Sequence, residues 1–308
     1  MGGGERVGAA EALPAWLERR RGLAPLIVSF PHTGTDIPIE IEPHFTSSWL
    51  ARKDTDWWVD RLYEMAHELD ATTLRTRISR SVIDVNRDPS GASLYPGRAT
   101  TELCPTTTFD GEPLYRDGRA PDRAEIARRR ARYFEPYHAA LAAEVERLLR
   151  EHGRVVLYDA HSIRSRIPRL FEGTLPHFNI GTHGGRSCHP ALARAIEGAC
   201  DAPLFTRVTD GRFKGGWTVR HHGRPEEGVH AVQMEIACRA YLEEPAAPDA
   251  SGAPRMPATP NEVRAQALSE HNWPPALDAA RAAPARRVLA RVLHVCDQFA
   301  RTQNGGPA

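Results

Sequence analysis

Apolar residues along the chain occur in two patterns: short continuous runs and longer stretches with helical spacing. Val155–Tyr158 is a short, β-branched run behind the turn signal His152-Gly153, and it predicts a buried strand. Asp122–His152 repeats its apolar residues at near-helical intervals after the start signal Pro121-Asp122, and it predicts a helix. Strands that alternate with helices in this way predict an α/β sheet with helices on its faces.

The other elements follow from the same two patterns. The predicted strands are Leu26–Phe30, Thr72–Arg77, a short strand within 81–91, Val155–Tyr158, Phe178–Gly181 and Val229–Ala237. The predicted helices are Glu11–Arg21, Trp57–Leu69, Asp122–His152, Pro190–Cys200 and Pro284–Arg301. Residues 92–121 are rich in Gly, Pro and Thr without a clear period, so we expect a long structured loop of the kind that often carries function.

The chain of 308 residues contains no internal repeat, and we expect a single α/β domain over 1–308. Residues 1–10 are expected to be disordered. The stretch 243–283 is rich in Pro and Ala, and we expect it to be a surface segment. A C-terminal helix at 284–301 should follow, with Pro284 in its first turn, where the missing N–H has no cost.

Charge and cysteine usage exclude several classes of protein. The chain has 40 basic and 39 acidic residues, so it lacks the basic excess of a nucleic-acid-binding or membrane-surface protein. Its five cysteines are widely spaced without a C-x-x-C pair, which argues against a disulfide framework and a cysteine zinc site and fits a reducing compartment. No run of 18 apolar residues and no signal peptide is present, so we expect a cytoplasmic protein.

Polar residues with catalytic potential follow the predicted strands. His32 comes after Leu26–Phe30, and His161 comes after Val155–Tyr158. Because chemistry in such sheets gathers at the carboxyl ends of strands, these histidines suggest a zinc site, which needs a third ligand. Segment 54–60 (DTDWWVD) offers Asp54, Asp56 and Asp60. The alternatives are that Asp54 only caps a helix and that each histidine is hydrogen-bonded without a metal.

Four further residues are candidates for a binding, catalytic or structural role. Asn86 and Arg87 leave the strand predicted within 81–91 and are suited to clamping an anionic group through the guanidinium fork. Asp84 is better suited to a structural ion pair. Glu235 lies inside an apolar strand, where burial raises its pKa and suits it to act as a general base. A salt bridge to Arg239 is the alternative for Glu235.

Weaker signals compete with these. No G-x-S-x-G motif occurs, which disfavours a serine hydrolase. The stretch 181-GTHGG-185 lacks the full phosphate-loop pattern, and with the D-x-H at 159–161 it suggests a metallophosphoesterase, although the G-N-H-[ED] loop of that class is absent. His221 and His222 are candidates for extra ligands or proton carriers, with a flexible polar loop as the alternative.

Several motifs in order carry a family resemblance: SFPHTGTDIP, DTDWWVDRLY, SRSVIDVNR, LYPG, TFDGEPLY, DAHSIRS, FNIGT and GVHAVQMEI. From about residue 24 to residue 242 the chain closely resembles the N-formylglutamate amidohydrolase (N-formylglutamate deformylase) family of histidine degradation, which is similar to zinc carboxypeptidases and aspartoacylases. The resemblance implies a phosphorylase/hydrolase-like α/β fold with a central mixed sheet. It also implies a metal-dependent amide hydrolase.

The resemblance implies roles for individual residues. His32 and His161 match the two histidine ligands, Asn86-Arg87 match the pair that holds a substrate carboxylate, and Glu235 matches the general base. The chain departs from the carboxypeptidase H-x-x-E motif because position 35 is Thr. The carboxylate ligand must then come from elsewhere, and we expect Asp56, with Asp36 and Asp54 as the alternatives. A second departure, His222 in place of an expected Tyr, affects fine substrate preference.

The resulting hypothesis is hydrolysis of the formamide of N-formyl-L-glutamate to formate and L-glutamate at a zinc ion, with cobalt, manganese or iron as other metals that such ligands accept. The dicarboxylate substrate calls for two cationic clamps. We expect Arg87 with Asn86 as the first and Arg164 as the second, with Arg80 and Arg220 in reserve. The alternatives are hydrolysis of another N-acyl acidic amino acid and a non-catalytic metal- or ligand-binding protein on the same scaffold.

Overall fold

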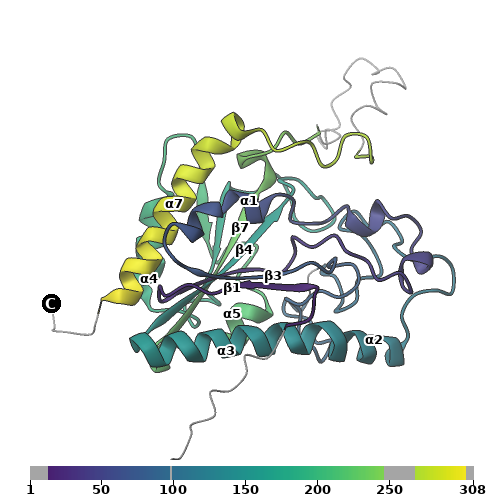
Figure 1. Cartoon of the computed structure of the whole chain (residues 1–308). Helices are drawn as coiled ribbons and strands as arrows, with labels where there is room; N and C mark the ends of the chain where they lie inside the picture. The colour runs from purple at the N-terminus through teal and green to yellow at the C-terminus, as the bar shows by residue number, and fades with distance from the viewer. Residues whose placement is uncertain (1–12, 98, 246–267, 303–308) are drawn as a thin grey trace, which may run out of the picture.

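A seven-stranded mixed sheet forms the centre of the molecule (Figure 1). The computed structural model describes residues 13–97, 99–245 and 268–302. The strands are β1 (Leu17–Arg20), β2 (Leu26–Phe30), β3 (Thr72–Thr76), β4 (Val155–Ile163), β5 (Phe178–Gly181), β6 (Arg207–Thr209) and β7 (Val229–Ala237). Their order in the sheet is β1-β3-β2-β4-β7-β5-β6. The expected α/β class with a central mixed sheet is confirmed.

Helices cover both faces of this sheet. The α-helices are α1 (Val59–Leu62), α2 (Arg123–Arg129), α3 (Glu135–His152), α4 (Pro190–Cys200), α5 (Trp217–His222) and α7 (Ala279–Arg301). The short helices are η1 (Glu42–His44), η2 (Leu50–Arg52), η3 (Glu64–His67), η5 (Pro225–Glu227) and η6 (Cys238–Ala240), with a π-helical stretch η4 (Arg130–Phe134). No helix within the described ranges has the length and apolar character needed to span a bilayer.

Alternation along β4 shows how the sheet separates two hydrophobic layers. Val156 and Tyr158 pack on one face with α1, α4 and α7, whereas Val155 and Leu157 pack on the other face with α3 and α5. Figure 1 shows α3 along one side of the sheet and α7 with α4 along the other. A strand covered on both faces has no position for a solvated side chain, which explains why this run is apolar throughout.

Parallel pairing places the candidate chemistry at one edge of the sheet. β4 pairs in parallel with β2 on one side and with β7 on the other. The carboxyl ends of these three strands therefore lie together, and His32, His161 and Glu235 all belong to them. His161 lies inside β4 rather than after it, because β4 continues to Ile163 through its pairing with β7.

Two of the predicted elements are wrong. The helix predicted at Glu11–Arg21 is replaced, over its described part, by strand β1, because Leu17–Arg20 pairs antiparallel with the outer edge of β3. The strand predicted within 81–91 is absent. Its backbone is satisfied locally instead: Asn86 N–H donates to Asp84 Oδ1 at 2.9 Å, and Asp84 N–H donates to the Leu103 carbonyl at 2.7 Å.

Other predicted elements are present with changed limits. The helix predicted over Trp57–Leu69 is broken into α1 and η3 at Tyr63, although Val59, Leu62 and Ala66 still face the core. The long helix begins at Arg123, capped by Asp122, and contains the π-helical stretch before α3. Within the polar stretch 207–229 lie β6, α5 and η5, so this region is more ordered than its composition suggested.

The C-terminal helix also differs from the prediction. α7 starts at Ala279 with Asp278 as its cap, so Pro284 lies inside the helix and not in its first turn. The predicted surface segment 243–283 falls mostly outside the described residues, as do residues 1–10. In its described part most side chains are exposed or half-buried, whereas Trp273 is buried and its Nε1 donates to the Lys53 carbonyl at 3.0 Å.

Candidate active site

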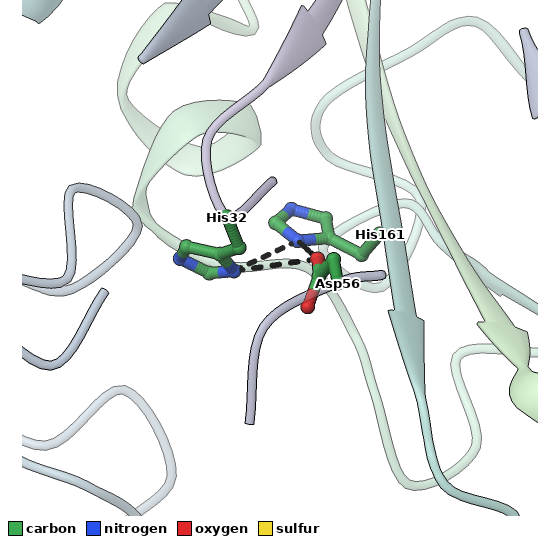
Figure 2. Close-up of side chains that lie close together, drawn as sticks. All are labelled: His32, Asp56 and His161. Carbon is green, nitrogen blue, oxygen red and sulfur yellow. Dashed lines mark hydrogen bonds and ion pairs between the residues drawn. The ribbon is translucent and has the colours of Figure 1, made fainter. Parts of the chain in front are cut away.

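Two histidines and one aspartate from distant parts of the chain meet at this edge of the sheet. Figure 2 shows the side chains of His32, Asp56 and His161 pointing toward one another. His161 Nδ1 lies 3.0 Å from Asp56 Oδ2 and 3.1 Å from His32 Nδ1, and His32 Nδ1 lies 3.6 Å from Asp56 Oδ2. All three side chains are almost completely buried. The geometry thus brings together the three residues that the sequence suggested as ligands.

Backbone contacts hold the two loops of this group in place. His32 lies two residues beyond β2, and its carbonyl accepts a hydrogen bond from Asp56 N–H at 3.0 Å. Gly34 lets the His32 loop approach the next segment closely, since a Cβ there would lie 2.4 Å from the Arg77 carbonyl carbon. The loop that carries Asp56 then enters α1.

Each histidine is oriented by a carboxylate behind it. His32 Nε2 lies 2.7 Å from Asp84 Oδ1, and His161 Nε2 lies 2.8 Å from Asp159 Oδ2. With its Nε2 proton donated outward, a neutral imidazole presents the lone pair of Nδ1 on the other side. Both Nδ1 lone pairs therefore face the Asp56 carboxylate. This is the arrangement in which protein carboxylates orient histidine ligands of metal ions.

The inner group matches the needs of a divalent cation. Three electron-pair donors that face one another need a positive charge between them. Ligands about 2.1 Å from a shared tetrahedral ion lie roughly 3.4 Å apart, close to the separations seen here. A His/Asp donor set suits zinc and several other divalent metals. The residues present thus fit a metal ion, although they do not distinguish one metal from another.

The other aspartates considered as ligands are engaged elsewhere. Asp36 forms an ion pair with Arg77 at 2.9 Å. Asp54 Oδ2 accepts a hydrogen bond from Phe109 N–H at 2.6 Å, so it anchors a loop and does not cap a helix. Asp60 lies 3.5 Å from Arg75. Among these candidates only Asp56 reaches both histidines.

Charges around the group set its protonation. Burial by itself would raise the pKa of Asp56, but the adjacent His161 and His32 rings hold that pKa below its usual range. Burial would lower the pKa of His161, yet Asp159 and Asp56 together raise it well above its usual value. In the absence of a cation, a proton on His161 therefore supplies the positive charge that the three donors need.

Glu235 lies beside His161 on the neighbouring strand. The two residues are paired in the register of β4 and β7, and both line the same cavity. Burial raises the pKa of Glu235 to about 8, and His161 opposes that rise. Its carboxylate accepts a hydrogen bond from Gln233 Nε2 at 3.3 Å. The alternative salt bridge to Arg239 is not found, because that side chain lies against His177.

The cavity extends from the histidines to a set of arginines. It has a volume of about 60 Å³, and its lining includes Arg80, Arg87 and Arg212 together with Tyr95 and Thr101. Arg80 donates to Asp84 Oδ2 at 2.8 Å and to Asp56 Oδ1 at 3.3 Å, so its charge is matched by carboxylates next to the histidines. Asp84 thus has the ion pair expected for it.

Arg87 and Asn86 both line the cavity but differ in their hydrogen-bond partners. Arg87 donates to Thr101 Oγ1 at 3.0 Å and lies 3.5 Å from Asp84, while lining the cavity. The amide of Asn86 is used inside the protein: Nδ2 donates to Asp159 at 3.2 Å, and Oδ1 accepts from Thr218 N–H at 2.8 Å. Gly216 permits this contact, since a Cβ there would meet Asn86 at 2.4 Å.

The two remaining predicted clamps do not line this cavity. Arg164 donates to Asp110 at 2.7 Å and lies 3.5 Å from Asp54, just beyond the end of β4. Arg220 donates to the Gly215 carbonyl at 2.9 Å from α5. Their expected role as substrate clamps therefore has no support in where the structure places them.

The two histidines of α5 also lie outside the cavity lining. His222 is buried, with its Nε2 3.0 Å from His138 Nδ1, and His221 stacks on Trp217 with ring centroids 4.9 Å apart. They belong to a helix, so the expected flexible loop is wrong. His222, which replaces an expected tyrosine, has a packing partner of its own and no contact with the cavity.

Sequence reasoning missed several cavity residues. Tyr95 and Thr101 belong to the long loop predicted at 92–121, whose composition suggests a functional role without indicating any one residue. Gln233 could have been found from strand alternation, because it precedes Glu235 by two positions and shares its face. Arg212 lies in a glycine-rich stretch without a periodic pattern and gave no local signal.

Comparisons with known proteins identify the family of the chain. Residues 24–242 match the family model described as N-formylglutamate amidohydrolase. The N-formylglutamate deformylase of Pseudomonas aeruginosa is 48% identical over 231 residues, which cover 75% of this chain and 86% of that protein. The N-formylglutamate deformylase of Pseudomonas putida is 43% identical over 229 residues, which cover 74% and 85%.

A solved structure provides a comparison of the fold. The crystal structure of N-formylglutamate amidohydrolase from Ralstonia eutropha JMP134 has a TM-score of 0.69 and 23% identity, with 94% of this chain and 99% of that chain covered. At this identity the likeness concerns the fold alone. With a family match over most of its length and two relatives above 40% identity, the chain belongs to the N-formylglutamate amidohydrolase family.

Proposed function

We propose that this protein is a metal-dependent amidohydrolase that cleaves the formamide of N-formyl-L-glutamate to formate and L-glutamate. The observation that carries the proposal is the convergence of His32, Asp56 and His161 beside Glu235 in a cavity lined by arginines. Two relatives above 40% identity that bear the name N-formylglutamate deformylase support the choice of substrate. A place in histidine degradation remains a prediction from the family resemblance.

His32, Asp56 and His161 would hold the metal, for which zinc is our first choice. A divalent cation there supplies Lewis-acid polarisation of the formyl oxygen and a lower pKa for nearby water. Asp84 and Asp159 keep the Nε2 atoms of the two histidines protonated and their Nδ1 atoms free to bind. Arg80 fixes the second oxygen of Asp56 and so limits rotation of that carboxylate.

Glu235 moves the proton in this proposal. As a carboxylate it takes a proton from the attacking water, and as an acid it returns that proton to the amine nitrogen that leaves with glutamate. A group whose pKa lies near the working pH performs both steps well, and burial brings the pKa of Glu235 to about 8. Its position next to His161 across the β4–β7 pair supports this role, because Glu235 then lies beside the proposed metal ligands.

Arginines in the cavity wall are suited to bind an anionic substrate. The guanidinium of Arg87 is suited to hold the carboxylate nearest the amide, because its Nε lies 3.5 Å from Asp84, the partner of His32.

We also propose a cytoplasmic location, since all five cysteines are unpaired and buried, as expected in a reducing compartment.

The test is formate release by purified full-length protein that has been stripped of metal and then reloaded with zinc, cobalt, manganese or iron. Stripping should lower the rate on N-formyl-L-glutamate by about 100-fold or more, and at least one cation should restore it. Glu235→Gln should bind zinc normally and lose roughly 10²- to 10⁴-fold in kcat.

Full activity in the stripped protein would remove the metal from the proposal. Absence of formate with every cation would remove the proposed function, and a phosphoester substrate in parallel would show whether a phosphatase activity takes its place. Unchanged kcat in Glu235→Gln would transfer the proton step to another residue.

A further inference from the structure

Two loops contribute to the wall of the cavity: the first is 92–121, and the second is 210–216, between β6 and α5. Tyr95 of the first loop joins the two. Its ring lines the cavity from the first loop, and its hydroxyl reaches the backbone of the second loop. The hydroxyl donates to the Gly215 carbonyl at 3.0 Å and accepts from Lys214 N–H at 3.1 Å. Both sides of this polar group are used, so the two loops are fixed relative to each other.

Arg212 lines the cavity from the second loop, and the ring of Tyr95 helps to orient it. Its guanidinium lies over the Tyr95 ring at 5.5 Å and over the Phe213 ring at 5.2 Å. Nε donates to the Leu170 carbonyl at 2.9 Å, and Nη2 donates to the Ala99 carbonyl at 3.0 Å. These contacts hold a planar, permanently charged group at the cavity wall, which is the form suited to carboxylate recognition.

We propose that Arg212, positioned by Tyr95, recognises the side-chain carboxylate of the substrate and thereby selects acidic N-formyl amino acids. This inference rests on the proposed function, because it assigns the second clamp that a dicarboxylate substrate requires. It replaces Arg164, which lies outside the cavity lining and is paired with Asp110 and Asp54.

The order of the two clamps follows from their neighbours. Arg87 contacts Asp84, which in turn holds His32, so Arg87 lies close to the reacting end. Arg212 donates instead to the carbonyls of Leu170 and Ala99, which lie in loops and not next to the histidine ligands in the chain. In N-formylglutamate the α-carboxylate adjoins the amide, and the side-chain carboxylate lies farther along. Arg87 therefore matches the first carboxylate and Arg212 the second.

Arg220 provides a matched control. Its guanidinium also lies over the Tyr95 ring, at 5.1 Å, and its Nε donates to the Gly215 carbonyl at 2.9 Å. It contacts the same aromatic ring and the same loop as Arg212 but is not among the residues that line the cavity. A general loss of loop structure would affect variants of both arginines, whereas loss of a substrate contact would affect Arg212 alone.

The experiment compares N-formyl-L-glutamate with N-formyl-L-glutamine, which has a neutral amide of similar shape, on zinc-loaded protein. Wild type should prefer the acidic substrate by about 100-fold in kcat/KM. Arg212→Gln should lose about 100-fold on the acidic substrate and change less than about threefold on the amide. The Kd of the product L-glutamate, measured by calorimetry, should rise by a similar factor.

Three further variants separate recognition from folding. Arg220→Gln should leave both substrates within about threefold of wild type. Tyr95→Phe, which keeps the ring and loses the hydroxyl, should raise KM for the acidic substrate about fivefold with kcat within about twofold. Arg212→Lys keeps a charge and should retain part of the preference, which guards against misfolding of the glutamine variant.

The outcomes distinguish this inference from the proposed function. If wild type releases no formate, the proposed function fails and the inference fails with it. If wild type is active but Arg212→Gln keeps the preference, or loses both substrates equally, Arg212 is not the selective clamp and the proposed function still stands. Equal effects of Arg212→Gln and Arg220→Gln would also overturn the inference.

Discussion

Two pairs of buried histidines in this protein have nearly the same distance between facing ring nitrogens and opposite chemistry. In the candidate metal centre, the Nδ1 atoms of His32 and His161 are 3.1 Å apart. Between α3 and α5, His138 Nδ1 and His222 Nε2 are 3.0 Å apart. The pKa of His161 is raised well above its usual value, whereas burial lowers that of His138 to about 4 and that of His222 to about 2.

The partners on the outer side of each ring explain the difference. His138 Nε2 donates to the Val85 carbonyl at 2.7 Å, so its Nδ1 is an acceptor and His222 can donate to it. That pair is complete with neutral rings. The rings of His32 and His161 both donate outward to carboxylates, so two lone pairs and the Asp56 carboxylate face inward and need a positive charge. The partner of the outward-facing nitrogen therefore determines whether the inward-facing nitrogen of a buried histidine donates or accepts.

The neutral pair still supports the active site from a distance. His138 holds the carbonyl of Val85, and the neighbouring Asn86 accepts hydrogen bonds from the first residues of α5, Trp217 N–H at 3.0 Å and Thr218 N–H at 2.8 Å. His222 is the last residue of the same helix. The pair thus fixes the helix and the segment against which the Asp159–His161 contact is built.

The largest effect that separates the two pairs comes from alanine substitution. His161→Ala removes an inward-facing donor, so zinc binding should be lost and kcat/KM on N-formyl-L-glutamate should fall at least about 1,000-fold. His138→Ala should keep zinc affinity within about fivefold and lower the free energy of unfolding by about 2 kcal/mol through the lost hydrogen bond and the cavity left behind. Chelator competition and denaturant unfolding measure the two quantities.

That contrast fails if His138→Ala loses zinc as completely as His161→Ala at equal folded fraction. It also fails if His161→Ala retains zinc and turnover, because another residue would then complete the ligand set.

A smaller effect is expected from the carboxylate behind a ligand. Asp159 accepts from His161 Nε2 at 2.8 Å and from Ser29 Oγ at 2.6 Å. Asp159→Asn should lower zinc affinity about 10- to 100-fold, because the histidine loses its charged partner while the shape of the side chain is kept. Asp54→Asn is the matched control: Asp54 is also a buried aspartate, but its carboxylate holds Phe109 N–H and not a histidine.

Zinc affinity should be unchanged in Asp54→Asn, as measured with a chromogenic chelator. Equal losses in both variants would mean that general loss of buried negative charge, and not orientation of His161, determines the affinity.

How much of the candidate site can be predicted from the sequence depends on how far apart in the chain the interacting residues lie. His32, His161 and Glu235 could be predicted because each follows or interrupts an apolar strand, and parallel strands bring their ends together. Asp56 is the expected ligand, but no local signal separates it from Asp54, two positions away in the same loop. That choice depends on the hydrogen bond from Asp56 N–H to the His32 carbonyl, a contact between separate loops.

Residues outside the cavity lining have the same explanation. Nearness to His161 in the chain suggests Arg164, but β4 ends at Ile163 and the next side chain turns to Asp110. Arg212 reaches the cavity through contacts with Tyr95, far away in sequence. Leu17–Arg20 has no strand pattern of its own and pairs because β3 offers an open edge. The single-domain organisation over 1–308 remains a prediction.

A further difference between the two pairs is a pH dependence of stability that belongs to the neutral pair. In the folded protein the pKa of His138 is about 4 and that of His222 about 2, below the usual value for histidine of about 6.5. Between the folded and unfolded pKa values only the unfolded chain binds these protons. Stability is therefore full above about pH 6.5 and falls as the pH decreases, by up to about 1.4 kcal/mol per pH unit for each histidine.

Replacing His222 with Tyr tests this assignment. A tyrosine hydroxyl can still donate to His138 Nδ1 but does not take up a proton in this range, so His222→Tyr should make the decline in Tm between pH 6.5 and about 4 shallower. The exposed His271 serves as the control, because His271→Gln should leave the decline unchanged. Should His222→Tyr follow the wild-type curve, acid sensitivity would arise from the carboxylates around His32 and His161. The neutral pair would then not be the source of the pH dependence of stability.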